Sequence, residues 1–481
     1  MMSAEPAEAA RRAARRAAVA RGRVLFNRGE FWDSHEAWES AWRITDGPER
    51  AGLQGLVQAA AAFHKFVVQD HAAGACRLID RAAAALAPIA PCGLGLDLRA
   101  LLGELAAWRA RLAEPPTDAT IVALPHLDWA PAARAGGVAP MVIESVDLRL
   151  VEVAGRRSLV AAVSGDGVTG WGEVVVPWDD HGAWSAARTT LAPALLTEAV
   201  ASPAELPVRW RGLAAERRAA AALEMAAWDA AARRAGLPFH TVLGIVARPV
   251  AVAQRLHGVS AAALAEGIDR ARRANVGAVH VPARPNADRR LLPGLAAELS
   301  GLWYAFDLDA AYRMADVAAL RVLADLRPAF LHRVFAADAL ADVRHMGRWL
   351  DVPLSIGEIG GADALANAHA LGAAAVVQVD VGWVGPYEAH RMLELAPALG
   401  VAAWVGSPSL TPIGARASLA VAASAGAGLP CAPGDGWTAW EGVDALASDG
   451  TWTPPPGDGL ALDPPTDWLA AHEVIHERLQ A

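Results

Sequence analysis

The chain has 481 residues, which is too long for one ordinary domain and sufficient for two or three domains, each with its own core. Apolar residues make up 54% of the chain and charged residues 20%, a balance that excludes a disordered or fibrous protein. The formal net charge of −9 provides no basic field that would attract nucleic acid.

The sequence also shows no sign of a membrane or secretory route. No apolar run approaches the length of a membrane span, and no N-terminal segment has the apolar core of a signal peptide. Three cysteines, Cys76, Cys92 and Cys431, are far apart and lack any metal-binding spacing. We therefore expect a cytoplasmic protein in a reducing compartment, with neither nucleic acid nor a membrane as its partner.

The basic residues are unusual in kind. Of the 43 lysine and arginine residues, only Lys65 is a lysine. Such a composition is typical of a GC-rich genome, but its chemical consequence is strict. Nothing after residue 65 can use a lysine amine as a base, as an electrostatic clamp or as a Schiff-base nucleophile.

The first part of the chain is helical in pattern. Residues 1–22 are rich in alanine, arginine and glutamate and predict a solvated N-terminal extension. Residues 23–113 keep helical periodicity throughout, for example in the spacing of Phe31, Trp38 and Trp42, and predict a compact all-helical domain. A stretch rich in proline, alanine and glycine at 114–140 predicts a linker.

From residue 141 the pattern changes to strands. Apolar alternation up to residue 176 predicts a β-meander, and helices follow, so we place a mixed domain at 141–245. Beyond it, short apolar runs alternate with helical stretches at a spacing of about 25 residues, which indicates a parallel βα barrel at 246–430. The expected strands include 278–281, 303–307, 329–334, 354–358, 376–380 and 402–406. Residues 431–481 are expected to return to the mixed domain and to end in a short helix from about Asp467.

Two segments match known motifs in the wrong context. Residues 165–170 fit the dinucleotide pattern G-x-G-x-x-G, but a strand follows where the motif needs a helix, so we expect a hairpin. Residues 472–476, His-Glu-Val-Ile-His, fit the zinc pattern H-E-x-x-H, but no third ligand follows in the chain given. We expect a solvated terminal helix there.

A third group lies in the helical domain. His35 and Glu39 share one helix face beside Glu36. Facing them the pattern places Gln54, Gln58 and His64. These residues suit either a metal or small-molecule site or a buried polar network that fixes the helix register, and we favour the network.

The helical domain resembles a known family. Residues 26–39, Phe-Asn-Arg-Gly-Glu-Phe-Trp-Asp-Ser-His-Glu-Ala-Trp-Glu, and residues 49–60, Glu-Arg-Ala-Gly-Leu-Gln-Gly-Leu-Val-Gln-Ala-Ala, are similar to domain of unknown function 309. The resemblance covers about residues 23–113. It implies a small all-helical bacterial fold and supplies no activity.

The rest of the chain resembles the enolase superfamily, in the muconate-lactonising and o-succinylbenzoate-synthase branch. The matching segments are Gly-Trp-Gly-Glu at 170–173, Leu-Glu-Met-Ala-Ala-Trp-Asp at 223–229, and the stretches 307–312, 352–358, 376–385 and 406–414. The predicted fold class is therefore multidomain α and α/β, with an all-α bundle followed by an enolase-type α+β capping domain and a (β/α)7β TIM-like barrel. The resemblance also implies a magnesium site at the C-terminal ends of the strands and frequent homo-oligomers.

The family removes a proton next to a carboxylate while a metal stabilises the enediolate, with lysines as the usual acid/base pair. Here the lysine-x-lysine strand reads His280-Val281-Pro282, and Asp380 stands where the opposite lysine is expected. In the mandelate-racemase branch such an aspartate supports a histidine on the next strand, but residues 404–407 contain no histidine. His280 and Asp380 are thus the candidate catalytic residues.

The metal positions depart from the family as well. The first metal carboxylate is kept as Asp307, followed by Asp309 where asparagine is usual. The second position, normally glutamate, is His332, and the third is Glu358 after Gly357. By resemblance these four residues hold Mg²⁺. Because imidazole is among them, Zn²⁺, Mn²⁺ or Fe²⁺ would suit the set better.

Several functions remain open. In the first, the chain has lost the lysine-dependent chemistry and binds a small carboxylic acid. Arg284 and Arg333 would then lie at the barrel mouth, and no metal would be required. Alternatively, a rebuilt site drives metal-assisted hydrolysis, lyase or isomerase chemistry, with Asp380 or Glu358 as the base, or unfamiliar residues carry out the family reaction. A scaffold or regulatory fusion, in which the helical domain contacts a protein partner, is the non-enzymatic alternative.

Overall fold

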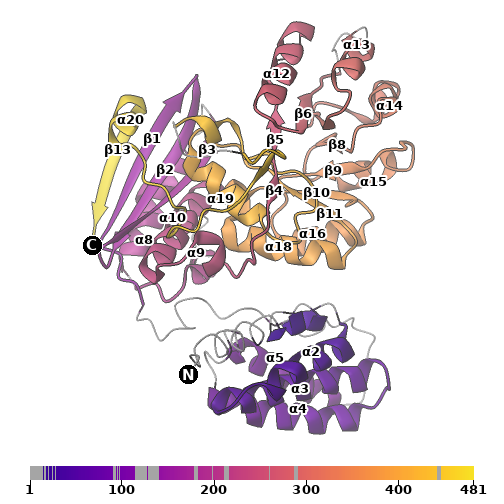
Figure 1. Cartoon of the computed structure of the whole chain (residues 1–481), viewed down its shortest axis with the longest axis vertical. Helices are drawn as coiled ribbons and strands as arrows, with labels where there is room; N and C mark the ends of the chain where they lie inside the picture. The colour runs from indigo at the N-terminus through magenta and orange to yellow at the C-terminus, as the bar shows by residue number, and fades with distance from the viewer. Residues whose placement is uncertain are drawn as a thin grey trace, which may run out of the picture. The chain divides into compact units, whose positions relative to one another are not determined.

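The computed structural model describes two compact units, residues 1–139 and 140–481 (Figure 1). The described residues are 18–19, 21–23, 25–27, 29–89, 98–113, 140–177, 182–197, 199–210, 216–258, 260–285, 291–440 and 446–481, with the isolated positions 15, 94, 96 and 127. Most of the predicted extension (1–22) and linker (114–140) lies outside these residues, as does Cys92. Each unit has its own apolar core.

The first unit is helical, as predicted. Its described elements are α2 (Phe31–Arg43), α3 (Pro48–Val67), α4 (Ala72–Leu86), the 3₁₀ helix η1 (Ala87–Ile89) and α5 (Leu98–Ala113). The predicted apolar stripes meet in one core, where the ring of Phe26 lies 5.2 Å from Phe31, 5.4 Å from Trp38 and 6.0 Å from Phe63. Helix α3 begins at Pro48, whose fixed φ suits the first helical position.

The second unit begins with a capping domain. Its elements are β1 (Ser145–Val153), β2 (Arg156–Gly165), β3 (Val168–Val176), α7 (Gly182–Ala186), the π-helix η3 (Ala187–Leu191), α8 (Ala192–Thr197), η4 (Pro203–Glu205), α9 (Leu206–Trp210), α10 (Arg217–Ala235) and α11 (Phe239–Val242). Asp166 and Gly167 join β2 to β3 in a two-residue turn and both have positive φ, as hairpin turns of this length favour. The hairpin interpretation of the glycine-rich motif is confirmed.

The C-terminus differs from the prediction. Helix α20 (Thr466–His472) stops at His472, and β13 (Glu473–Gln480) pairs antiparallel with β1 at the edge of the cap sheet. The predicted terminal helix over residues 472–476 is therefore wrong, and the two histidines of the motif do not share a helix face. Pairing with a strand more than 300 residues away overrode the local helical pattern, and His476 Nε2 instead contacts Asp147 Oδ1 at 2.9 Å.

In the part of the chain that the structure describes, six of the barrel strands occur where the apolar runs predicted them, and a further strand at residues 253–255 lies before the predicted runs. The barrel strands are β5 (Ala253–Arg255), β6 (Ala278–Pro282), β7 (Trp303–Asp307), β8 (Leu331–His332), β9 (Leu354–Ile356), β10 (Val376–Val379) and β11 (Ala402–Val405), parallel neighbours in chain order. Residues 431–432 bridge both edges of this sheet, because Cys431 pairs with Val252 and Ala432 pairs with Gly406. Backbone pairing therefore continues around the barrel, with a short eighth strand segment. A small ribbon of β4 (Val250–Ala251) and β12 (Thr451–Trp452) lies outside it.

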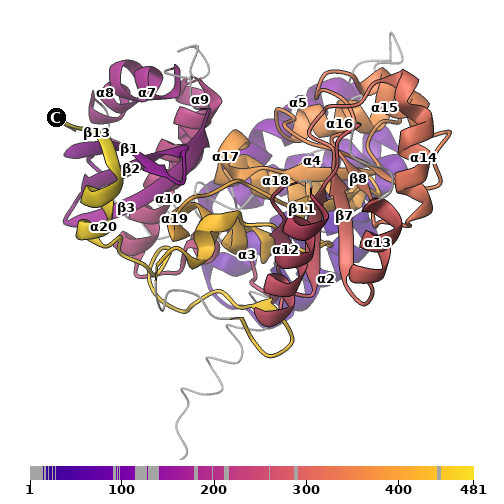
Figure 2. The same ribbon diagram turned by 90° about the horizontal axis from the view of Figure 1, so that it is seen from above.

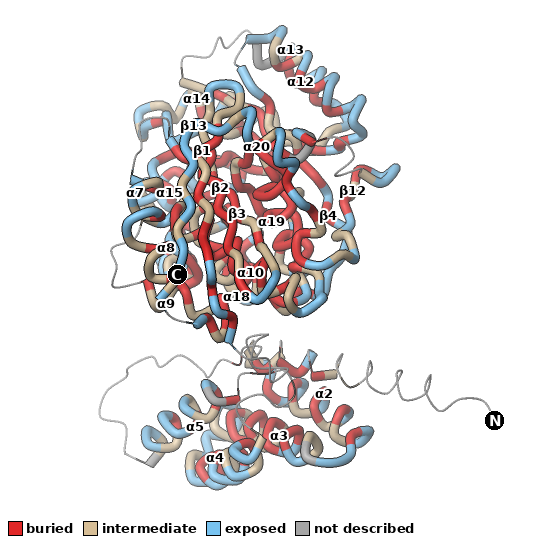
Figure 3. Tube along the Cα trace, turned by 90° about the vertical axis from the view of Figure 1, so that its left-hand side faces the viewer, coloured by how far each residue is buried: buried red, intermediate tan, exposed pale blue. Residues whose placement is uncertain are grey.

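Helices connect the barrel strands and lie outside them (Figure 2). They are α12 (Ala261–Arg273), α13 (Leu291–Glu298), η5 (Met314–Asp316), α14 (Val317–Asp325), α15 (Leu340–Met346), α16 (Ala362–Ala370), α17 (Val381–Val384), α18 (Pro386–Ala398), α19 (Pro412–Ala422) and η6 (Asp435–Thr438). Every residue of α19 is buried (Figure 3), and together with α10 this helix lies between the cap sheet and the barrel. Among the described residues, no helix is both long and apolar enough to cross a bilayer.

Candidate functional site

The predicted site residues lie on or just after neighbouring barrel strands. Across the sheet, Pro282 pairs with Asp307, Asp307 with His332, and His332 with Ser355. Because paired residues of parallel strands point to the same side, this register places Asp307, His332 and Ser355 next to one another. The resemblance to the enolase superfamily implies metal positions at Asp307 and His332 and gives no role to Ser355.

The two histidines are buried inside the barrel. His280 is fully buried, with ring centroids of Trp404, Phe330 and Trp303 at 4.4, 5.8 and 5.9 Å, and neither of its ring nitrogens has a hydrogen-bond partner. It therefore packs among the aromatic side chains of the interior instead of projecting into an open mouth. His332 is equally buried; its Nδ1 lies 3.1 Å from Ser355 Oγ, and its Nε2 has no partner.

Burial decides the charge of both imidazoles. Burial, with the positive charge of Arg255, lowers the pKa of His280 to about 3. The pKa of His332 is likewise lowered to about 3, chiefly by burial. Both rings are neutral at neutral pH, so neither is a strong base there.

Asp307 lies beside positive charge. Arg255 Nη2 is 3.5 Å from Asp307 Oδ2. Burial alone would raise the pKa of Asp307, but His332, Arg255 and Arg333 outweigh it and lower the pKa to about 2. Since the imidazole is neutral near pH 7, the two guanidinium groups keep this carboxylate ionised.

Arg333 joins the other two predicted metal carboxylates. Its Nη1 donates to Glu358 Oε1 at 2.7 Å, and its Nη2 donates to Asp309 Oδ1. Arg284 Nη2 donates to the second oxygen of Asp309 at 2.7 Å. Asp309, Arg333 and Glu358 all have φ between 50° and 55°, a region that side chains other than glycine rarely adopt. Such strain is typical of functional sites and is concentrated here at the strand ends.

Asp380 is held by the helix that follows it. Its Oδ1 accepts a hydrogen bond from the backbone N–H of Gly382 at 2.9 Å and thereby caps α17. Burial raises the pKa of Asp380, against the effects of Ser407 and Arg218. The side chain predicted as a base is thus part of a helix cap.

The arrangement does not suit Mg²⁺. This ion requires near-octahedral coordination by oxygen, whereas the predicted donors are one carboxylate beside Arg255, two carboxylates bridged by Arg333, and an imidazole. Among the residues that the structure describes, the ligand atoms of Asp307, Asp309, His332 and Glu358 do not come together as a group that could hold an ion. The positions of these residues therefore support no chemical step through a metal at the barrel mouth.

Comparisons with known families follow the same division of the chain. Residues 142–244 match the mandelate racemase / muconate lactonizing enzyme N-terminal domain, and residues 259–468 match the enolase C-terminal domain-like family. This part of the chain belongs to the enolase superfamily. Residues 19–78 match the domain of unknown function DUF309, which covers the start of the helical unit.

Individual relatives agree with this membership. An o-succinylbenzoate synthase from Geobacillus kaustophilus is 28% identical over 283 residues, which are 56% of this chain and 75% of that protein. An N-succinylamino acid racemase from Thermus thermophilus is 27% identical over 350 residues, 67% of this chain and 95% of that protein. The crystal structure of a muconate cycloisomerase from Pseudomonas fluorescens has a TM-score of 0.63 at 18% identity, covering 70% of this chain and all of that one, which shows the shared fold.

Two of the enolase-superfamily motifs act at the junction of cap and barrel. Glu173, the last residue of the Gly-Trp-Gly-Glu motif, is buried and accepts hydrogen bonds from Ser158 Oγ (2.8 Å) and Thr411 Oγ1 (2.7 Å). It also accepts from the backbone N–H groups of Leu410 (2.7 Å), Thr411 (3.1 Å) and Gly414 (3.0 Å). A carboxylate from the cap therefore occupies the N-terminus of α19, where unpaired N–H groups favour negative charge. In the sequence, the sign that Glu173 has such a role is that it is a single acidic residue in a mostly apolar strand.

The second motif provides two more buried carboxylates on α10. Asp229 accepts from the backbone N–H groups of Trp171 (2.9 Å) and Leu460 (2.6 Å), which ties the cap to the C-terminal segment. Glu224 Oε1 accepts from Trp228 Nε1 (3.2 Å) and from the backbone N–H of Tyr387 (3.1 Å) at the start of α18. In the sequence both residues belong to the enolase-superfamily motif at 223–229, and the motif by itself does not predict these contacts.

Glu224 should make the stability of the cap–barrel unit depend on pH. Burial raises the pKa of Glu224 from 4.5 to about 8, although its hydrogen bonds oppose the shift. The stability that the protonated Glu224 carboxyl provides is therefore fully present below pH 4.5 and is lost as pH rises through about 8. The unfolding free energy should fall by up to about 5 kcal/mol over this range. Urea unfolding at pH 5 and pH 8 should show a smaller loss of stability in Glu224→Gln than in the wild type.

The exposed Glu298 provides the control, since Glu298→Gln should keep the pH dependence of the wild type. Equal pH dependence in Glu224→Gln and the wild type would contradict the assignment of this carboxyl as the buried titrating group.

Proposed function

We propose that the barrel binds a small carboxylic acid and does not carry out lysine-dependent proton abstraction. Residues 140–481 contain no lysine, since the single lysine of the chain is Lys65. His280 lies on the strand that carries the lysine pair in the family, and His332 lies at a metal position; both imidazoles have a pKa of about 3 and accept no proton at neutral pH. The usual lysine acid/base pair is thus absent, and neither imidazole replaces it.

The observation that carries the proposal is the guanidinium group of Arg255. Its side chain is 32% exposed, and its Nη2 lies 3.5 Å from Asp307 Oδ2, without a hydrogen bond between them among the described contacts. Arginine keeps its charge at all physiological pH values and presents paired donors that match a carboxylate. Arg255 therefore retains donors for an incoming acid, while Arg333 and Arg284 already bind Asp309.

The names of the relatives support the class of ligand. They refer to o-succinylbenzoate, N-succinylamino acids and muconate. All three molecules carry carboxylate groups. A barrel that has kept this fold, lacks lysine and presents the guanidinium group of Arg255 would bind such an anion and leave it unchanged.

Thermal unfolding of the full chain with succinate, an N-succinylamino acid, o-succinylbenzoate and muconate tests the proposal. A ligand at about 100 times its Kd stabilises the folded state by about 2.7 kcal/mol, so at least one acid should raise Tm in the presence of EDTA. Arg255→Gln should abolish the rise. The matched variant Arg272→Gln, which removes a guanidinium on the outer helix α12, should retain it.

Two results would overturn the proposal. One is the absence of stabilisation by all four acids. The other is turnover of a substrate by an enzyme whose divalent metal, measured by elemental analysis, is lost in His332→Ala or Asp307→Asn, which would establish the rebuilt metal site instead.

A further inference from the structure

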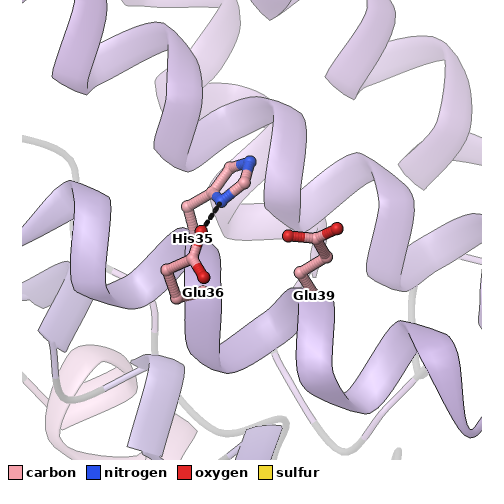
Figure 4. A group of neighbouring side chains, drawn as sticks. All are labelled: His35, Glu36 and Glu39. Atoms are coloured by element: carbon pink, nitrogen blue, oxygen red, sulfur yellow. Dashed lines mark ion pairs between the residues drawn. The ribbon is translucent and has the colours of Figure 1, made fainter.

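We propose that the helical unit binds one divalent transition-metal ion through His35, Glu36 and Glu39. The three residues lie on α2 at positions i, i+1 and i+4, and one potential ligand atom from each lies within 4.8 Å of the other two. Figure 4 shows the imidazole and the two carboxylates close together on one side of the helix. Among the residues that the structure describes, this is the one group with such spacing.

The imidazole nitrogen that faces the carboxylates is unsatisfied. His35 Nδ1 is buried and has no hydrogen-bond partner, although Glu36 Oε1 lies 3.4 Å away. Gln58 Oε1 on α3 is also buried without a partner. The buried polar network predicted from the sequence therefore does not form at these two atoms. An unpaired buried acceptor costs about 1–3 kcal/mol, and a cation shared with the carboxylates would remove that cost.

An aromatic side chain holds the imidazole in place. Trp32 stacks on His35 with ring centroids 5.2 Å apart and an interplanar angle of 4°, and it also contacts the ring of His64 at 5.3 Å. Trp32 is 54% exposed, so the arrangement lies where an ion can enter from solvent. A ligand whose orientation is fixed before binding loses less entropy when the metal arrives.

The donor set indicates the class of metal. One imidazole nitrogen and two carboxylate oxygens suit Zn²⁺, Mn²⁺ or Fe²⁺, whereas Mg²⁺ and Ca²⁺ favour oxygen ligands alone. Three protein ligands leave further positions for water or a small molecule. Arg43 Nη2 now donates to Glu39 Oε1 at 2.9 Å, but an exposed i,i+4 pair of this kind is weak and gives way to a bound ion.

Titration of the full chain with Zn²⁺, monitored by calorimetry, tests the site. We expect one equivalent to bind, and Co²⁺ as a spectroscopic probe to show absorption bands of a nitrogen- and oxygen-ligated ion. His35→Ala and Glu39→Gln should each weaken binding by more than about 100-fold, since loss of a group that merely orients a ligand already costs about 10- to 100-fold. Mg²⁺ should not compete.

The controls separate this site from the rest of the chain. Asp33→Asn removes an exposed carboxylate from the same helix, and Asp307→Asn removes the carboxylate at the barrel mouth; both should bind Zn²⁺ as the wild type does. Glu39→Gln is nearly isosteric at a half-exposed position, so it tests the site even if His35→Ala fails to fold. Absence of stoichiometric Zn²⁺ binding, or binding that survives Glu39→Gln, would overturn the proposal. Loss of Zn²⁺ binding in Asp307→Asn alone would also overturn it, because the ion would then bind in the barrel.

Discussion

Replacing Glu173 by alanine should lower the unfolding free energy of the cap–barrel unit by about 4 kcal/mol or more. The carboxylate accepts hydrogen bonds from three backbone N–H groups at the start of α19 and from two hydroxyl groups, all of them buried. Its removal leaves these donors unpaired, and each unsatisfied buried donor costs about 1–3 kcal/mol. Equilibrium unfolding in urea, followed by circular dichroism, measures the loss.

Glu144→Ala provides the comparison, because Glu144 is an exposed glutamate just before β1. That change should alter the unfolding free energy by less than about 0.5 kcal/mol. If Glu173→Ala were as stable as Glu144→Ala, the junction would depend on apolar packing alone and the carboxylate would have no part in joining cap to barrel.

Gly172→Ala should lower the unfolding free energy of the cap–barrel unit nearly as much as Glu173→Ala does, for a steric reason. A Cβ atom at residue 172 would lie 2.0 Å from the carbonyl oxygen of Ala222, and one at Gly170 would lie 2.0 Å from the backbone nitrogen of Ala230. Both neighbours belong to the backbone of α10, which cannot move aside as a flexible side chain would. Strand β3 and α10 would have to separate, and overpacking of this kind costs about 3 kcal/mol or more.

Gly277→Ala is the matched change, because a Cβ atom there meets nothing within 4 Å and the backbone φ is not in the left-handed region. It should leave the unfolding free energy unchanged or raise it by about 0.4–1 kcal/mol, because alanine reduces the conformational entropy of the unfolded chain. Thermal unfolding of the two variants side by side measures the difference. Similar Tm values would show that α10 can move away from β3 at little cost.

Local pattern was sufficient to predict most of the helices and strands, and the resemblance to the enolase superfamily implied site roles for residues at the strand ends. Asp307 was placed at a strand end because residues 303–307 form an apolar run of strand length, and the structure has a strand with these bounds. The shared helix face of His35 and Glu39 followed in the same way from 3.6-residue periodicity. Predictions of this kind depend only on residues that are close in sequence.

The partners of those residues could not be predicted in this way. Arg255 ends β5, a strand of three residues, and lies beside Asp307 because β5 pairs with β6 and β6 pairs with β7 in the barrel. Arg333 reaches both Asp309 and Glu358 because its backbone adopts a left-handed conformation after β8. These three contacts join loops or strands that are separated by 24 to 52 residues in the sequence.

The sequence by itself determined which chemistry residues 140–481 lack, because a chain segment without lysine has no ammonium group in any conformation. It also determined the order of most of the helices and strands, since periodicity is a local property. Only the tertiary structure decided that His280 and His332 are neutral, that residues 473–480 form a strand, and that Glu173 caps a helix of the barrel. Burial and long-range pairing depend on atoms contributed by distant parts of the chain, and these set the pKa of a side chain and the free energy of an unpaired donor.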